Sequence, residues 1–321
     1  MGLALGGGGA RGLSHIGVLT SLEKSHIPID LIVGTSMGAL VGGAYACGMT
    51  AGELERKVVE YLRSKEFKSS AIKSIEVTHR EHASFPRKIQ RFFKNRYYLV
   101  HALFRPGLLS KEEFQPTIDH FIPDILIEET PIPFRAVATD LISGEPIVFS
   151  EGSLREAVTA SCAVPGAVVP LKEGQWLLSD GGIINNVPTS VARKEGAGVV
   201  LAVAVTRNAA PEKEFETVLE IYYRASEIMS SKLQEYQLMQ ADIVISPDVG
   251  DLHWSSFSQA RDLIDEGERA TDERLNEIRD AVFGGRAKRW VWGLPGKIVS
   301  AIGMGERKTQ MAKKSSGLRA P

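Results

Sequence analysis

Short apolar runs alternate with amphipathic segments along most of the chain. Each run is bounded by glycine, proline or polar residues and predicts a buried strand. The runs cover residues 2–5, 29–33, 132–139, 146–150, 175–178, 198–205 and 242–246. Apolar residues at helical spacing predict helices over residues 13–25, 39–47, 154–162, 214–241 and 258–282, and residues 53–121 are mainly helical and polar.

This alternation predicts an α/β protein, because strands that are joined by crossover helices form a parallel sheet. The 321 residues are 43% hydrophobic and 24% charged, which is the composition of an ordinary soluble globular protein. Since the predicted strands extend from residue 2 to residue 246, we predict one domain over residues 1–283, with its core in residues 2–206. Residues 284–321 are expected to form a tail that is partly disordered or binds membrane.

The net charge of −1 gives no overall field that would attract nucleic acid. The charge is unevenly distributed, because the tail from residue 284 carries +8 and the rest of the chain −9. Cys47 and Cys162 have no metal-ligand spacing and fit a reducing compartment. The chain starts without a signal-peptide pattern and contains no long apolar run that could span a membrane. We therefore expect a cytoplasmic protein.

A run of glycines follows the first strand, over Gly6–Gly12. Gly7, Gly9 and Gly12 match the G-x-G-x-x-G pattern of dinucleotide-binding folds. That interpretation requires an acidic residue at the end of the second strand, whereas Asp30 precedes that strand. The glycine run is therefore weak support for a dinucleotide site.

The second strand runs directly into Gly34-Thr35-Ser36-Met37-Gly38, and a helix of small residues follows. A G-x-S-x-G pattern between a strand and a helix is typical of a nucleophile elbow, a tight turn that presents the serine hydroxyl above the sheet. Gly34 and Gly38 provide the space for this turn, and the helix N-terminus favours developing negative charge. The pattern predicts that Ser36 is a nucleophile; a chance match would make it an ordinary turn residue.

A serine nucleophile gives the glycine run a function. Acyl transfer needs N–H donors aimed at the oxyanion, and one donor is worth about 3–4 kcal/mol. A glycine run at the start of a helix exposes such donors without obstruction by side chains. We expect this oxyanion loop to contain Gly7, Gly8, Gly9, Ala10, Arg11 and Gly12. Arg11 either orients the loop or is a solvated residue at the helix start.

The base that activates Ser36 is less obvious from the sequence. A Ser–acid–His triad needs a histidine after the acid, and the one histidine after Asp180 is His253, in a polar loop without a preceding strand. Asp180 has a better context, because it follows a short strand and precedes Gly181 and Gly182. A carboxylate is a poor base at its usual pKa near 4, but desolvation raises that pKa. Asp180 can therefore serve as the base of a Ser–Asp dyad.

Three elements in this order resemble the patatin-like phospholipase family: the loop Gly7–Gly12, the elbow Gly34–Gly38 and the turn Asp180-Gly181-Gly182. Residues 12–19, 138–141, 160–166 and 185–188 further resemble its bacterial members. The similarity covers residues 2–206 and extends more loosely to residue 282. It implies a three-layer α/β/α sandwich with a mainly parallel central sheet.

The resemblance also implies a mechanism and a substrate class. Ser36 is then the nucleophile, Asp180 the base of a dyad without histidine, and Asp140 and Ser161 are structural residues. The expected activity is hydrolysis of lipid acyl esters, of the phospholipase A, lysophospholipase or carboxylesterase type, on a phospholipid or another fatty acyl ester. No metal, cofactor or nucleic acid is implied. The competing hypothesis is a non-catalytic lipid-binding or regulatory protein that keeps the fold.

Two basic segments are candidates for contact with a lipid surface. Residues 84–105 place Ile89, Phe92, Phe93 and Tyr97 on one helical face with basic residues opposite, which is typical of an interfacial helix or a lid but equally of a helix packed on a core. Residues 286–304 combine Lys and Arg with two tryptophans, a pattern that favours a membrane interface. We expect a peripheral association with the inner membrane face.

Overall fold

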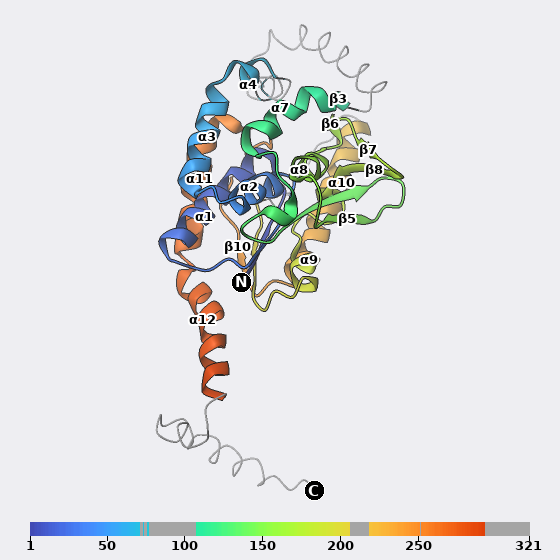
Figure 1. The fold of residues 1–321 in the computed structure, drawn as a ribbon. Helices are drawn as coiled ribbons and strands as arrows, with labels where there is room; N and C mark the ends of the chain where they lie inside the picture. The colour runs from blue at the N-terminus through green and yellow to red at the C-terminus, as the bar shows by residue number, and fades with distance from the viewer. Residues whose placement is uncertain (71–72, 74–75, 77–106, 206–217, 251, 293–321) are drawn as a thin grey trace, which may run out of the picture. The chain divides into compact units, whose positions relative to one another are not determined.

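A mixed β-sheet forms the centre of the fold in this computed structural model (Figure 1). The structure describes residues 1–70, 73, 76, 107–205, 218–250 and 252–292. The chain divides into two compact units, Met1–Leu275 and Asn276–Pro321, and the sheet belongs to the first. The predicted amphipathic segment 84–105 and most of the basic tail lie outside the described residues.

The central sheet contains β1 (Gly2–Leu5), β2 (Leu31–Thr35), β4 (Phe134–Asp140), β5 (Pro146–Phe149), β7 (Leu171–Glu173), β8 (Trp176–Asp180), β9 (Val200–Val203) and β10 (Ile243–Ile245). Their order is β10–β9–β1–β2–β4–β8–β7, and β5 pairs with β4. Neighbours from β10 to β4 are parallel, whereas β4 pairs antiparallel with β8 and β5, and β8 with β7. A separate parallel pair joins β3 (Gly107–Leu109) to β6 (Gly166–Val168).

The helices of the first unit are α1 (Ser14–Lys24), α2 (Met37–Ala46), α3 (Ala51–Arg63), α4 (Lys65–Ser69), α7 (Lys111–Phe121), α8 (Leu154–Ser161), α9 (Thr189–Lys194), α10 (Val218–Leu238) and α11 (Ala260–Asp272). Short 3₁₀ turns are η1 (Gly9–Leu13), η2 (Ile127–Glu129), η3 (Gly181–Ile183) and η4 (Phe257–Gln259). Helix α12 (Leu275–Trp292) forms the described part of the second unit.

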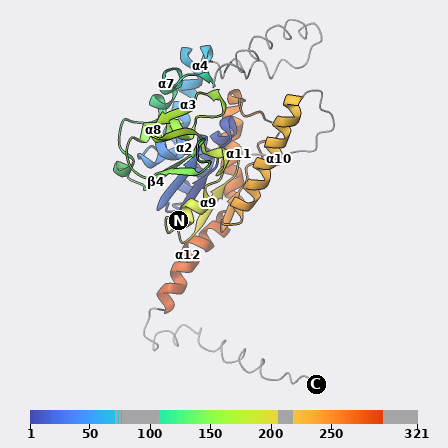
Figure 2. The ribbon, with the colours of Figure 1, turned by 90° about the vertical axis from the view of Figure 1, so that its right-hand side faces the viewer.

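Helices cover both faces of the sheet, which confirms the three-layer prediction. On one face, α2 packs over Leu5, Ile32 and Phe134 of three neighbouring strands. On the other face, Val191 and Ala192 of α9 join a core cluster with Ala4, Val33 and Val137. Figures 1 and 2 show α10 beside α9, whereas α11 runs along α1. Successive side chains of a strand point to opposite faces of the sheet, so the same strands contribute to the hydrophobic core on both faces.

Each strand predicted from an apolar run is present, but the helix predicted over residues 258–282 is wrong in its bounds. The structure has η4, α11 and α12 there, with a break at Glu273 and Arg274. The Arg274 guanidinium donates a 2.8 Å hydrogen bond to the Val244 carbonyl, which ties the break to the β10 strand. Helix α12 then continues through Gly284 and Gly285.

Strands β1 and β2 lie side by side, so the glycine loop after β1 and the elbow after β2 meet at one edge of the sheet. Helix α2 begins very close to the end of β1. A Cβ atom on Gly38 would lie 2.2 Å from the Leu5 carbonyl oxygen and 2.8 Å from that of Gly6. Any residue larger than glycine would therefore force the helix and the strand apart.

We expect Gly38→Ala to lower the free energy of unfolding by about 3 kcal/mol or more, because the added methyl group meets backbone that cannot move aside. The matched control is Gly52→Ala on α3, where nothing lies within 4 Å of the added atom. Replacing this helical glycine should raise stability by up to about 1 kcal/mol. Urea unfolding measures both changes, and equal stability of the two variants would contradict the close approach.

Candidate active site

Ser36 occupies the sharp turn between β2 and α2. It adopts φ 54° and ψ −124°, a conformation that is strained for a residue with a side chain. Its N–H donates to the Ser161 hydroxyl oxygen at 2.9 Å, and that hydroxyl donates to the Val137 carbonyl at 2.6 Å. Ser161 therefore holds the strained turn against β4, in agreement with the structural role expected for it.

Asp180 is the last residue of β8, and its side chain begins the η3 turn. One carboxylate oxygen accepts the Gly182 N–H at 2.6 Å, and the carboxylate also accepts a hydrogen bond from the Ser36 hydroxyl. Burial raises the pKa of Asp180 to about 6, and these two hydrogen bonds oppose the rise. At neutral pH such a carboxylate is mostly ionised, yet it accepts a proton more readily than an exposed aspartate does.

Strand register brings Ser36 and Asp180 together although they are distant in sequence. Thr35 pairs with Val137 in the neighbouring parallel strand, and Ala138 pairs with Asp180 in the next, antiparallel strand. Ser36 directly follows Thr35, so the ladder β2–β4–β8 fixes the position of both side chains. The catalytic pair predicted from the sequence is therefore in hydrogen-bond contact, although its role in catalysis stays a prediction.

The two histidines nearest to these motifs have other partners. Nδ1 of His253 lies 2.7 Å from the Ser255 hydroxyl. His15 is buried, with Nε2 2.7 Å from the Gly6 carbonyl oxygen, and burial lowers the pKa of His15 to about 4. His15 is therefore neutral and supports the start of the glycine loop. The triad interpretation through His253 gains no support from these contacts.

The predicted oxyanion loop lies against the elbow. A Cβ atom on Gly7 would lie 3.1 Å from Cβ of Ser36, and one on Gly12 would lie 2.5 Å from Cγ of Met37. Arg11 donates from Nε to the Gly8 carbonyl at 3.2 Å. Of the two roles left open for Arg11, this hydrogen bond favours orientation of the loop.

Two N–H groups of the loop are used to fix it in place. The Gly7 N–H donates to the Asn186 carbonyl at 3.1 Å, and the Ala10 N–H donates to the Trp254 carbonyl at 2.6 Å. These two groups are occupied and are poor candidates for binding an oxyanion. The loop is thereby attached to two segments that are far away in sequence.

Three other N–H groups remain available in the described part of the chain. Those of Gly8, Gly9 and Met37 donate to no backbone or side-chain acceptor among the described residues. Met37 begins α2, where the first N–H groups have no partner within the helix. Gly9, Ser36 and Met37 also line one cavity. The Met37 N–H was not predicted, although its position directly after the elbow serine could have indicated it.

Asn186 connects the glycine loop, the acid turn and helix α10. Its Nδ2 donates to Oε1 of Gln234 at 2.8 Å, and both side chains are buried. A Cβ atom on Gly182 would lie 3.1 Å from Oδ1 of Asn186, so the amide also lies beside the acid turn. Gln237, one turn further along α10, bonds the backbone of Ile184 and Val187. No sequence signal indicates these glutamines, because they belong to a segment outside the motifs.

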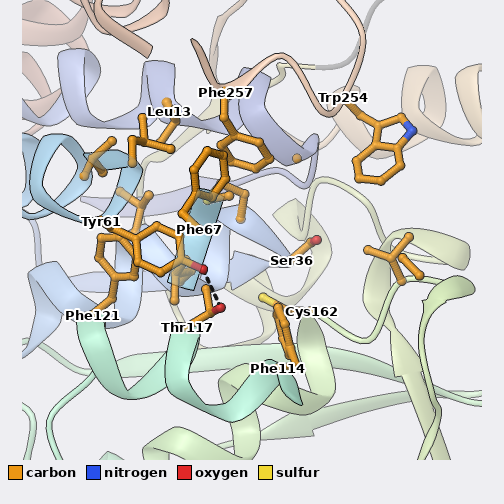
Figure 3. Close-up of a pocket in the computed structure, with 18 of the residues that line it drawn as sticks. Leu13, Ser36, Tyr61, Phe67, Phe114, Thr117, Phe121, Cys162, Trp254 and Phe257 are labelled. Carbon is orange, nitrogen blue, oxygen red and sulfur yellow. Dashed lines mark hydrogen bonds between the residues drawn. The ribbon is translucent and has the colours of Figure 1, made fainter. Parts of the chain in front are cut away.

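An apolar cavity begins at Ser36 and extends between α2, α3, α4 and α7 (Figure 3). Figure 3 shows the Ser36 hydroxyl at one side, with the rings of Tyr61, Phe67 and Phe257 gathered at the other. The Tyr61 and Thr117 hydroxyls lie 2.6 Å apart and share one hydrogen bond, in which one hydroxyl donates and the other accepts. Apart from these hydroxyls, Ser36 and the Cys162 thiol, the cavity presents mainly hydrocarbon to an occupant. The sequence indicated helices here but not the cavity.

Comparisons with known proteins assign the chain to a family. Residues 3–193 match the patatin-like phospholipase family, and the chain belongs to that family. It is 28% identical over 306 residues to an uncharacterized NTE family protein of Mycobacterium tuberculosis, covering 88% of this chain and 47% of that protein. It is 35% identical over 207 residues to mouse patatin-like phospholipase domain-containing protein 6, covering 63% of this chain and 13% of the mouse protein.

The chain spans about half the length of the mycobacterial relatives that it matches, 47% in one case and 51% in another from Mycobacterium bovis. Among solved structures, VipD from Legionella pneumophila is similar at a TM-score of 0.48 and 17% sequence identity. That similarity covers 86% of this chain and 67% of VipD.

The raised pKa of Asp180 predicts a pH-dependent stability. Because the folded state binds this proton more tightly than the unfolded chain, whose pKa is near 3.8, stability is highest below pH 4 and falls until about pH 6. Asparagine does not titrate, so the unfolding free energy of the wild type relative to Asp180→Asn should fall by about 2 kcal/mol between pH 4 and pH 7. Urea unfolding across this range measures it, and parallel curves would show that Asp180 is not desolvated.

Proposed function

We propose that this protein hydrolyses acyl esters of lipids, with Ser36 as the nucleophile and Asp180 as the general base. The observation that carries the proposal is that a hydrocarbon-lined cavity begins at a serine whose hydroxyl is hydrogen-bonded to a buried carboxylate. Such a cavity fits a fatty acyl chain, and the serine at its end is positioned for the ester carbonyl. Membership of the patatin-like phospholipase family supports the same chemistry.

The geometry supports the following mechanism. Ser36 attacks the ester carbonyl while Asp180 accepts its proton, and the N–H groups of Gly8, Gly9 and Met37 bind the oxyanion. Asp180 then donates the proton to the departing alcohol. Water, deprotonated by Asp180, attacks the acyl-enzyme, and Asp180 returns this proton to Oγ of Ser36 as the fatty acid is released. The burial that raises the pKa of Asp180 to about 6 makes it a better proton acceptor, and this chemistry requires no metal or cofactor.

The substrate and its location are part of the proposal. A phospholipid, a lysophospholipid or another fatty acyl ester presents the same reacting group to this site. Among the described helices, none is both long enough and apolar enough to cross a membrane. We infer a cytoplasmic protein that meets lipid at the inner membrane face through its basic segments. The alternative, a lipid-binding protein without catalysis, is disfavoured by the intact pair of Ser36 and Asp180.

Substitution of either dyad residue should abolish turnover. We expect Ser36→Ala to eliminate labelling by a fluorophosphonate probe, and Asp180→Asn to lower hydrolysis of a fatty acyl ester by about three orders of magnitude or more, because the nucleophile loses its base. His253→Ala is the control and should retain wild-type turnover. Absence of labelling in the folded wild type would favour the binding protein, and loss of activity in His253→Ala would favour a triad.

The cavity predicts a chain-length preference. Val58 on α3 lines the cavity, whereas its neighbour Val59 is exposed. Val58→Phe should fill part of the acyl site and lower kcat/KM for long-chain esters about tenfold or more relative to short-chain esters, which need less room. Val59→Phe, the matched control, should leave the profile unchanged. A panel of p-nitrophenyl esters measures both, and an equal shift in the two variants would exclude this cavity as the acyl site.

A further inference from the structure

Two hydroxyl groups meet in the wall of the otherwise apolar cavity. Tyr61 on α3 and Thr117 on α7 both line it, and their hydroxyl oxygens lie 2.6 Å apart. Figure 3 shows the two hydroxyls pointing toward one another, with a dashed line marking their hydrogen bond. The remaining hydroxyl among the lining side chains is that of Ser36, which donates to Asp180. We call Tyr61 and Thr117 the hydroxyl pair.

The hydroxyl pair has one hydrogen atom more than its hydrogen bond uses. Each hydroxyl carries one O–H donor and two lone pairs, and in a single O–H···O bond one group donates while the other accepts. Neither Tyr61 nor Thr117 makes a further side-chain hydrogen bond with the described residues. The accepting hydroxyl therefore has an O–H group for which the described part of the chain provides no acceptor.

The hydroxyl of Thr117 is directed away from its own helix. Three other helical threonines donate to the carbonyl four residues earlier, at distances between 2.6 and 2.9 Å: Thr20, Thr159 and Thr271. This is a common way for a threonine to satisfy its hydroxyl within a helix. Thr117 makes no such bond and contacts Tyr61 instead. In α7 the hydroxyl is thus placed at the cavity and not at the helix backbone.

The ring of Tyr61 is held by three other rings. Its centroid lies 5.6 Å from that of Phe67, 5.3 Å from that of His120 and 5.5 Å from that of Phe121. These contacts restrict the ring and, with it, the position of the hydroxyl. Tyr61 is half-buried, and this burial raises its pKa. The hydroxyl pair is therefore preorganised, which lowers the entropic cost of binding a polar group.

A plain hydrocarbon chain leaves the hydroxyl pair unused. Methylene groups neither donate nor accept, so a chain that fills the cavity covers the spare O–H group and removes it from water without replacing that contact. Covering a polar group in this way costs about as much as a lost hydrogen bond. A hydroxyl on the chain avoids this cost, because its oxygen accepts the spare hydrogen and its own hydrogen reaches a lone pair of the hydroxyl pair.

We propose that the hydroxyl pair recognises a hydroxyl group on the acyl chain, so that the preferred substrates are esters of hydroxylated fatty acids. This inference rests on the proposed function of the cavity as the acyl site. The hydroxyl of the chain accepts the hydrogen that Tyr61 and Thr117 leave over, and donates its own to one of their oxygens. Since the ester carbonyl is held at Ser36, the preference is confined to those positions along the chain that reach the pair.

The proposal is tested first by binding, in full-length protein with the Ser36→Ala substitution. Calorimetry compares dodecanoic and octadecanoic acid with their monohydroxy derivatives, each with the hydroxyl on a different carbon. At least one derivative should bind about fivefold more tightly than its parent acid, which corresponds to one net hydrogen bond. The further substitutions Tyr61→Phe and Thr117→Val together keep the ring and the methyl group, and should abolish this advantage. Tyr236→Phe, at a tyrosine 70% exposed on α10, should preserve it.

The outcomes separate this proposal from the proposed function. Equal affinity of all derivatives and their parent acids, or an advantage that the double substitution retains, overturns the hydroxyl specificity but leaves the acyl site intact. Absence of binding by every acid overturns both. Circular dichroism checks the fold of each variant, and Tyr61→Phe alone, which should lower the advantage at least twofold, replaces the double substitution if that variant is unfolded.

Turnover by the wild type gives a second test. The kcat/KM for the p-nitrophenyl ester of the best hydroxy acid should exceed that for the unsubstituted ester about fivefold, and the double substitution should bring this ratio to about one. Hydrolysis of both esters with equal kcat/KM by the wild type would agree with a lipid acyl hydrolase and contradict recognition of a hydroxyl.

Discussion

The close approach of α2 to the end of β1 is the constraint on which the site depends. Because Gly38 lies against the Leu5 carbonyl, helix α2 begins directly beside the end of β1, and the glycine loop and the serine elbow share one edge of the sheet. Parallel strands end at the same edge, and open α/β sheets bind ligands there. Gly9 and Met37, whose N–H groups have no acceptor among the described residues, line one cavity with Ser36 for this reason. Small residues around the elbow are therefore a packing requirement and also the basis of the site.

The buried Asp180 carboxylate lowers the stability of the folded protein at neutral pH, and the same burial favours its proposed role as a base. Its burial makes the ionised form costly, and the hydrogen bonds from Ser36 and Gly182 recover only part of that cost, since its pKa stays near 6. The strained backbone of Ser36 adds a second cost, which the Ser161 hydroxyl helps to offset. Both features are unfavourable for folding alone, and both favour a nucleophile with an adjacent base. Strain and desolvation that occur together in one place are typical of functional sites.

The sequence predicts those parts of the fold that depend on local signals. The strands β1, β2 and β9 are uninterrupted apolar runs, and the elbow and acid turn are marked by glycines whose roles are local. The strands β3, β6 and β7 have three residues each and are formed by pairing with other strands. Segments this short show no hydrophobic periodicity, so the sequence does not predict them. The Asn186–Gln234 hydrogen bond joins two residues that are 48 positions apart in the sequence. The sequence around either residue contains no pattern that predicts this contact. The break before α12 likewise depends on Arg274 reaching the β10 strand.

Helix α10 links these long-range contacts to the surface. Its inner face holds Asn186, whose carbonyl accepts the Gly7 N–H, so the oxyanion loop depends on the placement of this helix. Two buried amides fix its position but contribute little net free energy, since hydrogen bonds in proteins largely replace those made with water. Leu238, at the end of the helix, packs against the core cluster of Val187, Ala202 and Ala204 and adds an apolar contact to these amides. The position of Asn186, and with it that of the oxyanion loop, therefore depends on contacts that lie outside the active site.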